Sequence, residues 1–433
     1  MRTRLLALVC GAIVLAGCGR APAPSAAGSA TPGRAPSGLP SSPGQAGERT
    51  GWPAGSLVAA GRGCPAQPVP SFPAGFLTGI QFVSAARGWA VSQDQILATS
   101  DGGQHWRVQR SGQLNLTSVD FISGTVGWAV GADTLLATSD GGAHWAALPE
   151  PCLPIRSVHF ISPDAGFAVA GGRNVSDFGP ETPEIAGVIL TTSDGGRSWR
   201  VLPAPADAQT VCFTDPQAGW LGADGRLYRT ADGGRSWAQV TAGTQPPSAG
   251  DPATMIVQCA GQESAWALDV GPGAAMSQEP HVGYHAGAAG AVPIFAEQYF
   301  PHPGVHVAAG SPGSYAGPFS AISPSAAAFI DWCPACSDVG TAPWDLVTGS
   351  GASLIREGNV GGLTDPEAAS FLSPRLGWVA GVVTSYSGTG HFRQDLRIVF
   401  TNDAGRTWHV RAVTGKAPPA GSRRARCRRT RRP

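Results

Sequence analysis

The sequence has 433 residues, of which 60 are Gly, 38 are Pro and 13 are Trp, and its 30 basic and 29 acidic side chains give a formal net charge of +1. Nine of the basic residues lie at the two ends, so the body between them carries 21 basic against 29 acidic residues, about −8. An acidic body argues against nucleic-acid binding, which needs a basic surface facing the phosphates.

The first residues form a predicted export signal. Arg2 and Arg4 precede an apolar run over residues 5–15 that is too short to span a bilayer. The run ends in Leu15-Ala16-Gly17-Cys18, which resembles the lipobox of bacterial lipoproteins. The resemblance implies removal of residues 1–17 and lipidation of Cys18, so we expect a protein anchored on the outer face of the cell membrane. The alternative is an ordinary signal peptide with a chance Cys.

Both flanks of the predicted body lack a core-forming composition. After Cys18, residues 18–50 are dominated by Ala, Pro, Gly and Ser, which predicts a disordered tether, and residues 51–75 form a lead-in segment. The C-terminal residues 416–433 are expected to be a disordered tail, because seven of the last eleven residues are Arg. This tail could contact anionic lipid or wall polymers, or it could be an unselected solvated tail.

One eight-residue string occurs five times in the body, residues 76–415. Its pattern is T-x-D-x-G-x-x-W, and its copies begin at Thr99, Thr138, Thr192, Thr230 and Thr401. Ahead of each copy stands an apolar stretch ending in Phe, a turn, and then Gly-Trp or Gly-Phe. The aromatic anchors of these phrases are Trp89, Trp128, Phe167, Trp220 and Trp378. The first three are 39 residues apart, a spacing that accommodates four short strands and their turns.

Two further anchors lack the complete string. Trp266 is followed by residues 282–292, with Gly287 where Asp is expected. Phe329 is followed by residues 348–355, in which Ser350 replaces the Asp and Ile355 the Trp. Seven anchors predict an all-β fold, a seven-bladed β-propeller with four-stranded antiparallel blades, two of which are degenerate.

The string resembles the Asp-box, or bacterial neuraminidase repeat, and the Gly-Trp-Ala-Val phrase before it is similar to the photosystem II assembly-factor group of propellers. The resemblance covers roughly residues 76–412 and implies a turn between the third and fourth strands of each blade. In such a turn the Asp accepts backbone N–H bonds, the Gly takes a positive φ, and the Trp packs against a neighbouring strand or blade. We therefore expect structural rather than catalytic roles for Asp101, Trp106, Asp140, Trp145, Asp194, Trp199, Asp232, Trp237, Asp403 and Trp408.

The turns between second and third strands are predicted on the opposite face, and three of them are long. They are Gly171 to Gly187, Asp331 to Asp345 and Val382 to Gln394, and the connection over residues 293–320 is longer still. Loops that expand on one face of a rigid scaffold often carry function, although they can also be merely solvated. The candidate contacts on this face are Arg173, Asp177, Glu181, Asp331, Trp332, Trp344, Tyr386, His391 and Arg393.

The His and Cys residues predict neither a metal site nor a cofactor. His281 with His285, and His302 with His306, are four residues apart, but Pro303 and the Gly/Ala-rich surroundings rule out one helical face carrying both imidazoles. Export makes disulfides plausible, and the candidate cysteines are Cys64, Cys152, Cys212, Cys259, Cys333 and Cys336, with Cys427 left over. Cys212 and Cys259 lie in the first strands of consecutive blades and could pair, as could Cys64 with Cys152. For Cys333 and Cys336 a loop-closing disulfide is favoured over redox catalysis.

The function predicted from these features is binding. A sialidase would need an Arg-Ile-Pro motif, an arginine triad and a Tyr nucleophile, but no Arg-Ile-Pro occurs and only Tyr228 of five Tyr lies in the regular body of a blade. We expect a non-catalytic, membrane-anchored monomer that holds an exported or membrane protein partner as an assembly scaffold. The alternatives are a sialidase-like glycoside hydrolase, and a polysaccharide-binding module for wall glycan that uses Trp332 and Trp344 as sugar platforms.

Overall fold

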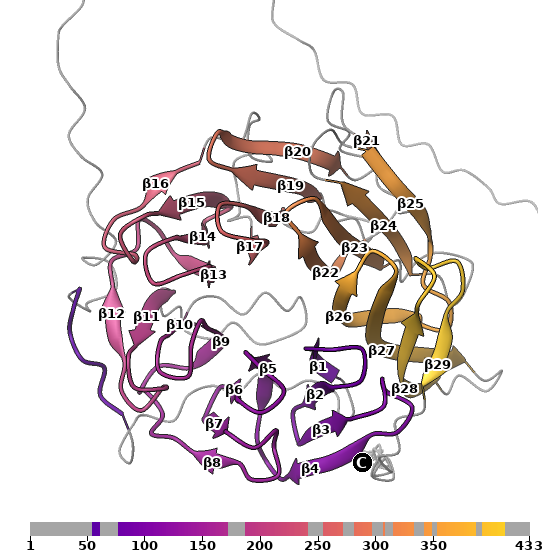
Figure 1. Cartoon of the computed structure of the whole chain (residues 1–433), viewed down its shortest axis with the longest axis horizontal. Helices are drawn as coiled ribbons and strands as arrows, with labels where there is room; N and C mark the ends of the chain where they lie inside the picture. Colours follow the sequence, from indigo (N-terminus) through magenta and orange to yellow (C-terminus); the bar gives the residue numbers. More distant parts are fainter. Residues whose placement is uncertain are drawn as a thin grey trace, which may run out of the picture. The chain divides into compact units, whose positions relative to one another are not determined.

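The computed structural model describes residues 54–60, 77–171, 187–240, 254–271, 281–296, 306–307, 315–332, 342–348, 353–386 and 392–411. The chain divides into two units, residues 1–42 and 43–433, and every described residue belongs to the second. The described part of this unit is all-β, with 29 strands in seven sheets that form a ring (Figure 1). The first strand of each sheet lies nearest the centre of the ring (Figure 1). The predicted seven-bladed propeller is therefore confirmed.

The first four blades, given from the centre outward, have the following strands. Blade one is β1 (Leu77–Phe82), β2 (Gly88–Ser92), β3 (Gln95–Thr99) and β4 (Arg107–Ser111). Blade two is β5 (Leu116–Phe121), β6 (Gly127–Gly131), β7 (Thr134–Thr138) and β8 (Ala146–Ala147). Blade three is β9 (Ile155–Phe160), β10 (Gly166–Ala170), β11 (Val188–Thr192) and β12 (Arg200–Leu202). Blade four is β13 (Ala208–Phe213), β14 (Gly219–Ala223), β15 (Arg226–Thr230) and β16 (Ala238–Gln239).

The last three blades include the two degenerate ones. Blade five is β17 (Thr254–Cys259), β18 (Ala265–Val270), β19 (His281–Gly287), β20 (Gly290–Ala296) and β21 (His306–Val307). Blade six is β22 (Tyr315–Ser323), β23 (Ala326–Trp332), β24 (Pro343–Thr348) and β25 (Ser353–Asn359). Blade seven is β26 (Asp365–Ser373), β27 (Leu376–Tyr386), β28 (Phe392–Thr401) and β29 (His409–Arg411). Neighbouring strands are antiparallel, except that β21 adds to β20 in parallel as a fifth strand.

The recurring Phe and Gly face each other across the first two strands of a blade. Phe82 ends β1 opposite Gly88 at the start of β2, and a Cβ on Gly88 would lie only 2.6 Å from the Phe82 ring. A side chain at this position would therefore displace the ring, so glycine lets the Phe lie flat over the neighbouring strand. The same arrangement recurs at Phe121 and Gly127, Phe160 and Gly166, Phe213 and Gly219, and Phe371 and Gly377.

The anchor aromatic of one blade stacks on the Phe of the next. Trp89 stacks on Phe121 with 3.5 Å between ring centroids, and its indole N–H donates to the carbonyl of Gly141 at 3.3 Å. Equivalent stacks join Trp128 to Phe160, Phe167 to Phe213, and Trp378 to Phe82. The core of the ring is thus a series of inter-blade aromatic contacts, and each buried Trp contributes several kcal/mol of hydrophobic stabilisation.

The ring closes between blades seven and one through side chains. All four strands of blade one come from the N-terminal part of the chain and all four of blade seven from the C-terminal part, so no blade mixes the two ends. Trp378 stacks on Phe82 at 3.6 Å and donates to the carbonyl of Gly102 at 3.0 Å. The backbone N–H of Phe82 donates to Ser370 Oγ at 3.0 Å.

A second set of inter-blade ties runs around the innermost strands. The residue before the Phe bonds the backbone of the next blade: Phe121 N donates to Gln81 Oε1 at 2.5 Å, and Phe160 N donates to Asp120 Oδ2 at 2.6 Å. The remaining hydrogen-bonded ties are His159 Nε2 to Phe213 O, Gln258 Nε2 to Phe319 O, and Phe371 N to Ser320 Oγ. Between blades four and five the same position holds a disulfide, Cys212 to Cys259, 47 residues apart, which is the pairing considered from the sequence.

Residues 54–60 run along the rim of blade three. The N–H of Val201 in β12 donates to Ser56 O at 3.0 Å, and Gly55 N donates to Val201 O at 2.7 Å. Val58 N donates to Trp199 O at 3.0 Å, and the Val58 side chain is buried. This lead-in segment therefore pairs with the outer edge of blade three through an isolated antiparallel bridge, Leu57 with Arg200.

Two predicted loop boundaries are wrong because strands continue through them. The expected insertion from Val382 to Gln394 is largely a hairpin, since β27 and β28 stay paired as far as Tyr386 and Phe392. β-branched residues such as Val383 and Thr384 suit an extended ladder. The connection expected over residues 293–320 is also shorter, because Pro293 lies in β20 and Ser320 in β22.

Candidate functional site

The five copies of the repeated string form turns between the third and fourth strands, which we call the repeat turns. In blade one, Thr99 Oγ1 donates to Asp101 Oδ1 at 2.9 Å and accepts from Gly103 N at 2.9 Å. Asp101 Oδ1 also accepts from His105 N at 2.9 Å, while Oδ2 lies 2.7 Å from His105 Nδ1. Gly103 has a φ of +86°, which favours glycine. The same bonds recur at Asp140, Asp194, Asp232 and Asp403, with His144, Ser198, Ser236 and Thr407 in place of His105.

Hydrogen bonds within each repeat turn hold its carboxyl group ionised. The backbone and side chain of His105 lower the pKa of Asp101 to about 2, and His144 does the same for Asp140. The Ser236 hydroxyl and backbone lower the pKa of Asp232 to about 2. A general acid needs a pKa near the working pH, so these carboxylates are unsuited to that role.

The closing Trp of each repeat turn stands edge-on to an inter-blade Phe. Trp106 meets Phe82 at 5.9 Å between ring centroids with planes at 87°, and Trp145 meets Phe121 at 5.8 Å and 89°. Trp199, Trp237 and Trp408 pack in the same way on Phe160, Phe213 and Phe371. Trp106 and Trp199 are buried and the other three are half-buried, so these rings take part in packing.

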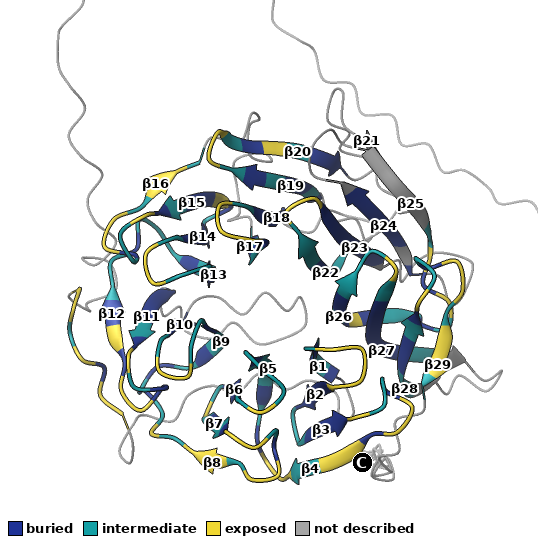
Figure 2. Ribbon diagram, viewed as in Figure 1, coloured by how far each residue is buried: buried dark blue, intermediate teal, exposed yellow. Residues whose placement is uncertain are grey.

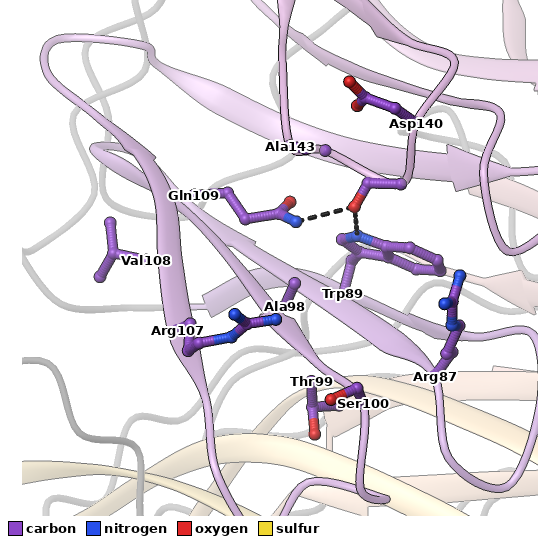
Figure 3. A pocket seen from close by; sticks show the side chains of 12 residues that line it. Arg87, Trp89, Ala98, Thr99, Ser100, Arg107, Val108, Gln109, Asp140 and Ala143 are labelled. Atoms are coloured by element: carbon purple, nitrogen blue, oxygen red, sulfur yellow. Dashed lines mark hydrogen bonds between the residues drawn. The ribbon is translucent and has the colours of Figure 1, made fainter.

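Between blades one and two the described residues enclose a cavity of about 390 Å³, which we call the blade one–two groove (Figure 3). Strands β2, β3 and β4 form one wall, and the repeat turn of blade two forms the other. The lining residues that bear polar groups are Arg87, Trp89, Thr99, Ser100, Arg107, Gln109 and Asp140, and Val108 adds an apolar side chain.

Most polar groups of the groove already have partners. Figure 3 shows Gln109 Nε2 and Trp89 Nε1 converging on the carbonyl of Gly141, at 2.7 and 3.3 Å. Arg87 Nη1 donates to Gly124 O at 2.8 Å, and Asp140 is bound within its own repeat turn. The Arg107 side chain makes no hydrogen bond or ion pair with any described residue. The groove therefore offers a cation and an apolar side chain for binding, and its one described lining carboxylate is already engaged.

The candidate binding face predicted from the loops does not assemble among the described residues. Trp344, expected in an exposed loop, is 1% exposed in β24 and packs against Phe371 and Trp408. Asp331 is 5% exposed, and its Oδ1 lies 3.2 Å from His281 Nε2 in the neighbouring blade. These two predictions are wrong because β23 continues through Asp331 and β24 begins at Pro343, which makes the insertion of blade six shorter than expected.

The other residues predicted for that face lie at or beyond the limits of description. Trp332, Tyr386 and Arg393 belong to β23, β27 and β28, but their side chains lie outside the described set. Outside the described residues altogether are Arg173, Asp177, Glu181 and His391, and also Cys18, Cys64, Cys333 and Cys336. Cys152 takes part in a disulfide.

Sequence reasoning missed a buried ionisable group in blade five. Asp269 lies in the otherwise apolar strand β18 and is 5% exposed, and burial raises the pKa of its carboxyl to about 7. A single acid in a strand of Ala, Trp, Leu and Val was the available signal. The described residues contain no cluster of three or more potential metal ligands, and no helix among them is long and apolar enough to cross a membrane.

Comparison with known proteins gives a partial family match. Residues 73–201, which span most of blades one to three, match the family model of the photosynthesis system II assembly factor YCF48. No curated protein matches the chain.

Solved structures share the fold at low sequence identity. The structure of U3-55K is 10% identical over 72% of this chain and 89% of that chain, with a TM-score of 0.50. YCF48 from Cyanidioschyzon merolae is 15% identical over 69% of this chain and 86% of that chain, with a TM-score of 0.44. An ancestral GH74 enzyme is 14% identical over 76% of this chain, with a TM-score of 0.49, and this chain spans about half of its length, 47%.

Proposed function

We propose that the chain is a non-catalytic scaffold that holds an exported or membrane protein during its assembly. The observation that carries this proposal is the match of residues 73–201 to an assembly-factor family model. It places the likeness on blades one to three, the same part of the ring that contains the blade one–two groove.

The chemistry of the described residues supports binding over catalysis. We assign the five repeat turns to the Asp-box type, in which the carboxylate closes a turn and the indole packs on the sheet. Each of these carboxylates belongs to a different blade and is saturated by its own turn. Acid–base hydrolysis of a glycoside requires two carboxyls within about 5–9.5 Å on either side of one bond.

A lipid anchor at Cys18 is part of the proposal and accounts for where the scaffold would act. The basic start, the short apolar run and the Leu-Ala-Gly-Cys ending support it. Expressed in a bacterium, the native chain should fractionate with membranes, and Cys18→Ser should prevent lipidation and release the chain from that fraction. A native chain recovered entirely in the soluble fraction would exclude the anchor.

The binding role is tested by affinity capture with the full chain from solubilised membranes. We expect one or a few exported or membrane proteins to be enriched, and Arg107→Glu in the groove to reduce their recovery. Arg375→Glu, on the turn between β26 and β27, is a control of equal charge change on a different blade. Hydrolysis of a fluorogenic sialoside or a β-glucan above the blank, with no captured protein, would replace the proposal with the glycosidase alternative.

A further inference from the structure

The same tripeptide opens the outer strand of two blades. Trp106-Arg107-Val108 leads into β4 of blade one, and Trp199-Arg200-Val201 leads into β12 of blade three. Both follow a repeat turn at the same distance. Because the local sequences are the same, the two strands should present the same edge to a segment lying along the rim.

In blade three that edge is occupied by the chain itself. Val201 exchanges two backbone hydrogen bonds with Gly55 and Ser56, at 2.7 and 3.0 Å, and Arg200 Nη1 lies 3.3 Å from Gly55 O. Val58 packs into the cluster that contains Trp199 and Val201. Blade three therefore shows what this tripeptide binds: an extended segment with two small residues followed by an aliphatic side chain.

Up to Val108 the register shows that β4 presents the same backbone groups outward; beyond it β4 is bulged at Gln109, whereas β12 continues without a bulge. Val201 lies opposite Leu190, two residues before the Thr of its repeat turn, and Val108 lies opposite Leu97, also two residues before its Thr. The N–H and C=O of Val201 both bond the outer segment, residues 54–60. Val201 and Leu190 are therefore a non-hydrogen-bonded pair of the antiparallel strands β11 and β12. The N–H and C=O of Val108 accordingly point away from β3.

Exposure separates the two sites. Val201 is 3% exposed beneath residues 54–60, whereas Val108 is 46% exposed and is one of the four large apolar side chains most open to solvent among the described residues. Figure 2 shows β4 as a largely exposed strand on the rim. No described segment pairs with its outer edge.

The other regular blades present smaller or partly covered edges. The outer strands β8 and β16 have two residues and β29 has three, against five in β4. In β29 the tripeptide is Trp408-His409-Val410, and a Cβ on Gly362 would lie 3.3 Å from Val410, so the connection from blade six already runs beside it. Short edge strands resist pairing, which leaves β4, among the outer strands of the regular blades, as the edge best able to accept another strand.

We infer that β4 is the docking edge for an extended segment of the partner protein, which adds to blade one as a fifth strand beside the blade one–two groove. The inference rests on the proposed function and specifies how the partner is held. Main-chain hydrogen bonds to Val108 give affinity, Arg107 reaches a backbone carbonyl as Arg200 does, and the exposed Val108 side chain contacts an aliphatic residue. The segment carries small residues followed by Val or Ile and lacks Lys and Arg, because Arg107 and Arg110 flank the edge.

The probe is a peptide with the sequence of residues 54–60, blocked at both ends and added in excess to the full chain. In the absence of peptide, the Val108 amide should exchange with deuterium at least about tenfold faster than the Val201 amide. With the peptide, exchange of the Val108 amide should slow by about tenfold or more. Protection confined to Val201 or to Val410 would overturn the assignment to β4.

Two variants of Val108 and one matched control test the geometry. Val108→Pro removes the outward N–H at an edge position where proline is tolerated, and Val108→Lys leaves the backbone intact; each should weaken the peptide by about tenfold. Val410→Pro makes the same change at the equivalent position of blade seven and should leave affinity unchanged. An unaltered affinity in both Val108 variants, with unchanged thermal unfolding midpoints, would overturn the inference.

Capture of the membrane partner separates this inference from the function on which it rests. If native chain and Val108→Pro retain the same partner equally, the scaffold function stands and docking on β4 is refuted. If the peptide binds β4 but no protein is captured, the scaffold function fails and the docking edge stands. A dimer of the full chain that Val108→Pro dissociates would assign the edge to a second copy and overturn the choice of a different protein.

Discussion

Replacing Trp378 by Ala should loosen the ring at the joint between blades seven and one. The Trp378 side chain is 0% exposed, stacks on Phe82 at 3.6 Å and donates to Gly102 O at 3.0 Å. Burial of about 150–250 Å² at about 25 cal/mol/Å² is worth about 4–6 kcal/mol before entropy, and Trp→Ala changes in cores cost about 3–5 kcal/mol. We expect a loss of about 4 kcal/mol in the free energy of unfolding.

The control for this prediction is Trp89→Ala. Trp89 makes the same contacts, with Phe121 at 3.5 Å and Gly141 O at 3.3 Å, but at a joint where the chain runs directly from β4 to β5. Denaturant unfolding should show losses of similar size for both variants. Hydrogen exchange should distinguish them, because only Trp378→Ala removes an aromatic contact at a joint where the chain does not run from one blade directly into the next. Amides of β1 and β26 that stay as protected in Trp378→Ala as in Trp89→Ala would refute this account of ring closure.

Three further predictions follow from the contacts between and within blades. Replacing both Cys212 and Cys259 by Ser should lower the free energy of unfolding by about 4 kcal/mol, because the disulfide closes a loop of 47 residues. Denaturant unfolding of the variant and the native chain without reductant tests this, and an unchanged denaturation midpoint would contradict it. Asp269→Asn should raise stability at pH 8 but not at pH 4, by up to about 4 kcal/mol. Between about pH 4 and 7 the Asp269 carboxyl of the folded chain, with its pKa raised to about 7, binds more protons than that of the unfolded chain, so the stability of the native chain falls as pH rises through this range. Parallel plots of stability against pH for the variant and the native chain would be inconsistent with this. Asp232→Ala should lower the unfolding midpoint above pH 4, and its difference from the native chain should shrink as pH falls through about 2, where the native carboxylate becomes protonated, while partner capture stays intact. Loss of capture without loss of stability would give Asp232 a role in binding.

The blade count was predictable because the features that mark a blade are local. Phe, Gly and Trp fall at fixed distances, since a Phe ring must lie over a glycine and an indole must reach the next blade. The degenerate blades lack Asp in their turns, and Trp266 keeps the anchor position of blade five. In blade six the predicted anchor Phe329 is one residue out of register: Ala328 lies opposite Ser320, and Phe329 packs back on Trp266 of blade five. A blade can therefore form without the repeat turn. Counting the anchors gave seven blades, whereas counting the eight-residue string would have given five.

The hydrogen bonds between the innermost strands of neighbouring blades could not be predicted from the sequence. The side chains that make them occupy equivalent positions in their blades but are of different residue types. Gln81, Asp120, His159 and Ser370 bond the next blade from equivalent places with four different side chains. Any group that can donate to or accept from a backbone amide satisfies the geometry. Only the disulfide at this position was foreseen, because two cysteines in adjacent first strands have no equally simple alternative.

Two residues of the loop-based binding face, Asp331 and Trp344, are buried for a physical reason that applies to inserted segments in general. The insertion of blade six was expected from Asp331 to Asp345, but the ladder of β23 and β24 extends into both ends of that range. Trp344 was therefore placed in solvent, although β24 is buried on both faces from Trp344 to Val347.

The rim, by contrast, is where this chain already adds strands to its own blades. Outer strands leave a row of backbone groups unpaired, and the chain covers β12 with residues 54–60 and β20 with β21. Gly55 bonds a strand that lies almost 150 residues later, so no local pattern predicts the pairing. Because the tripeptide that holds this segment in blade three recurs in blade one with an exposed valine, the rule that completes the fold also indicates where another chain can join it.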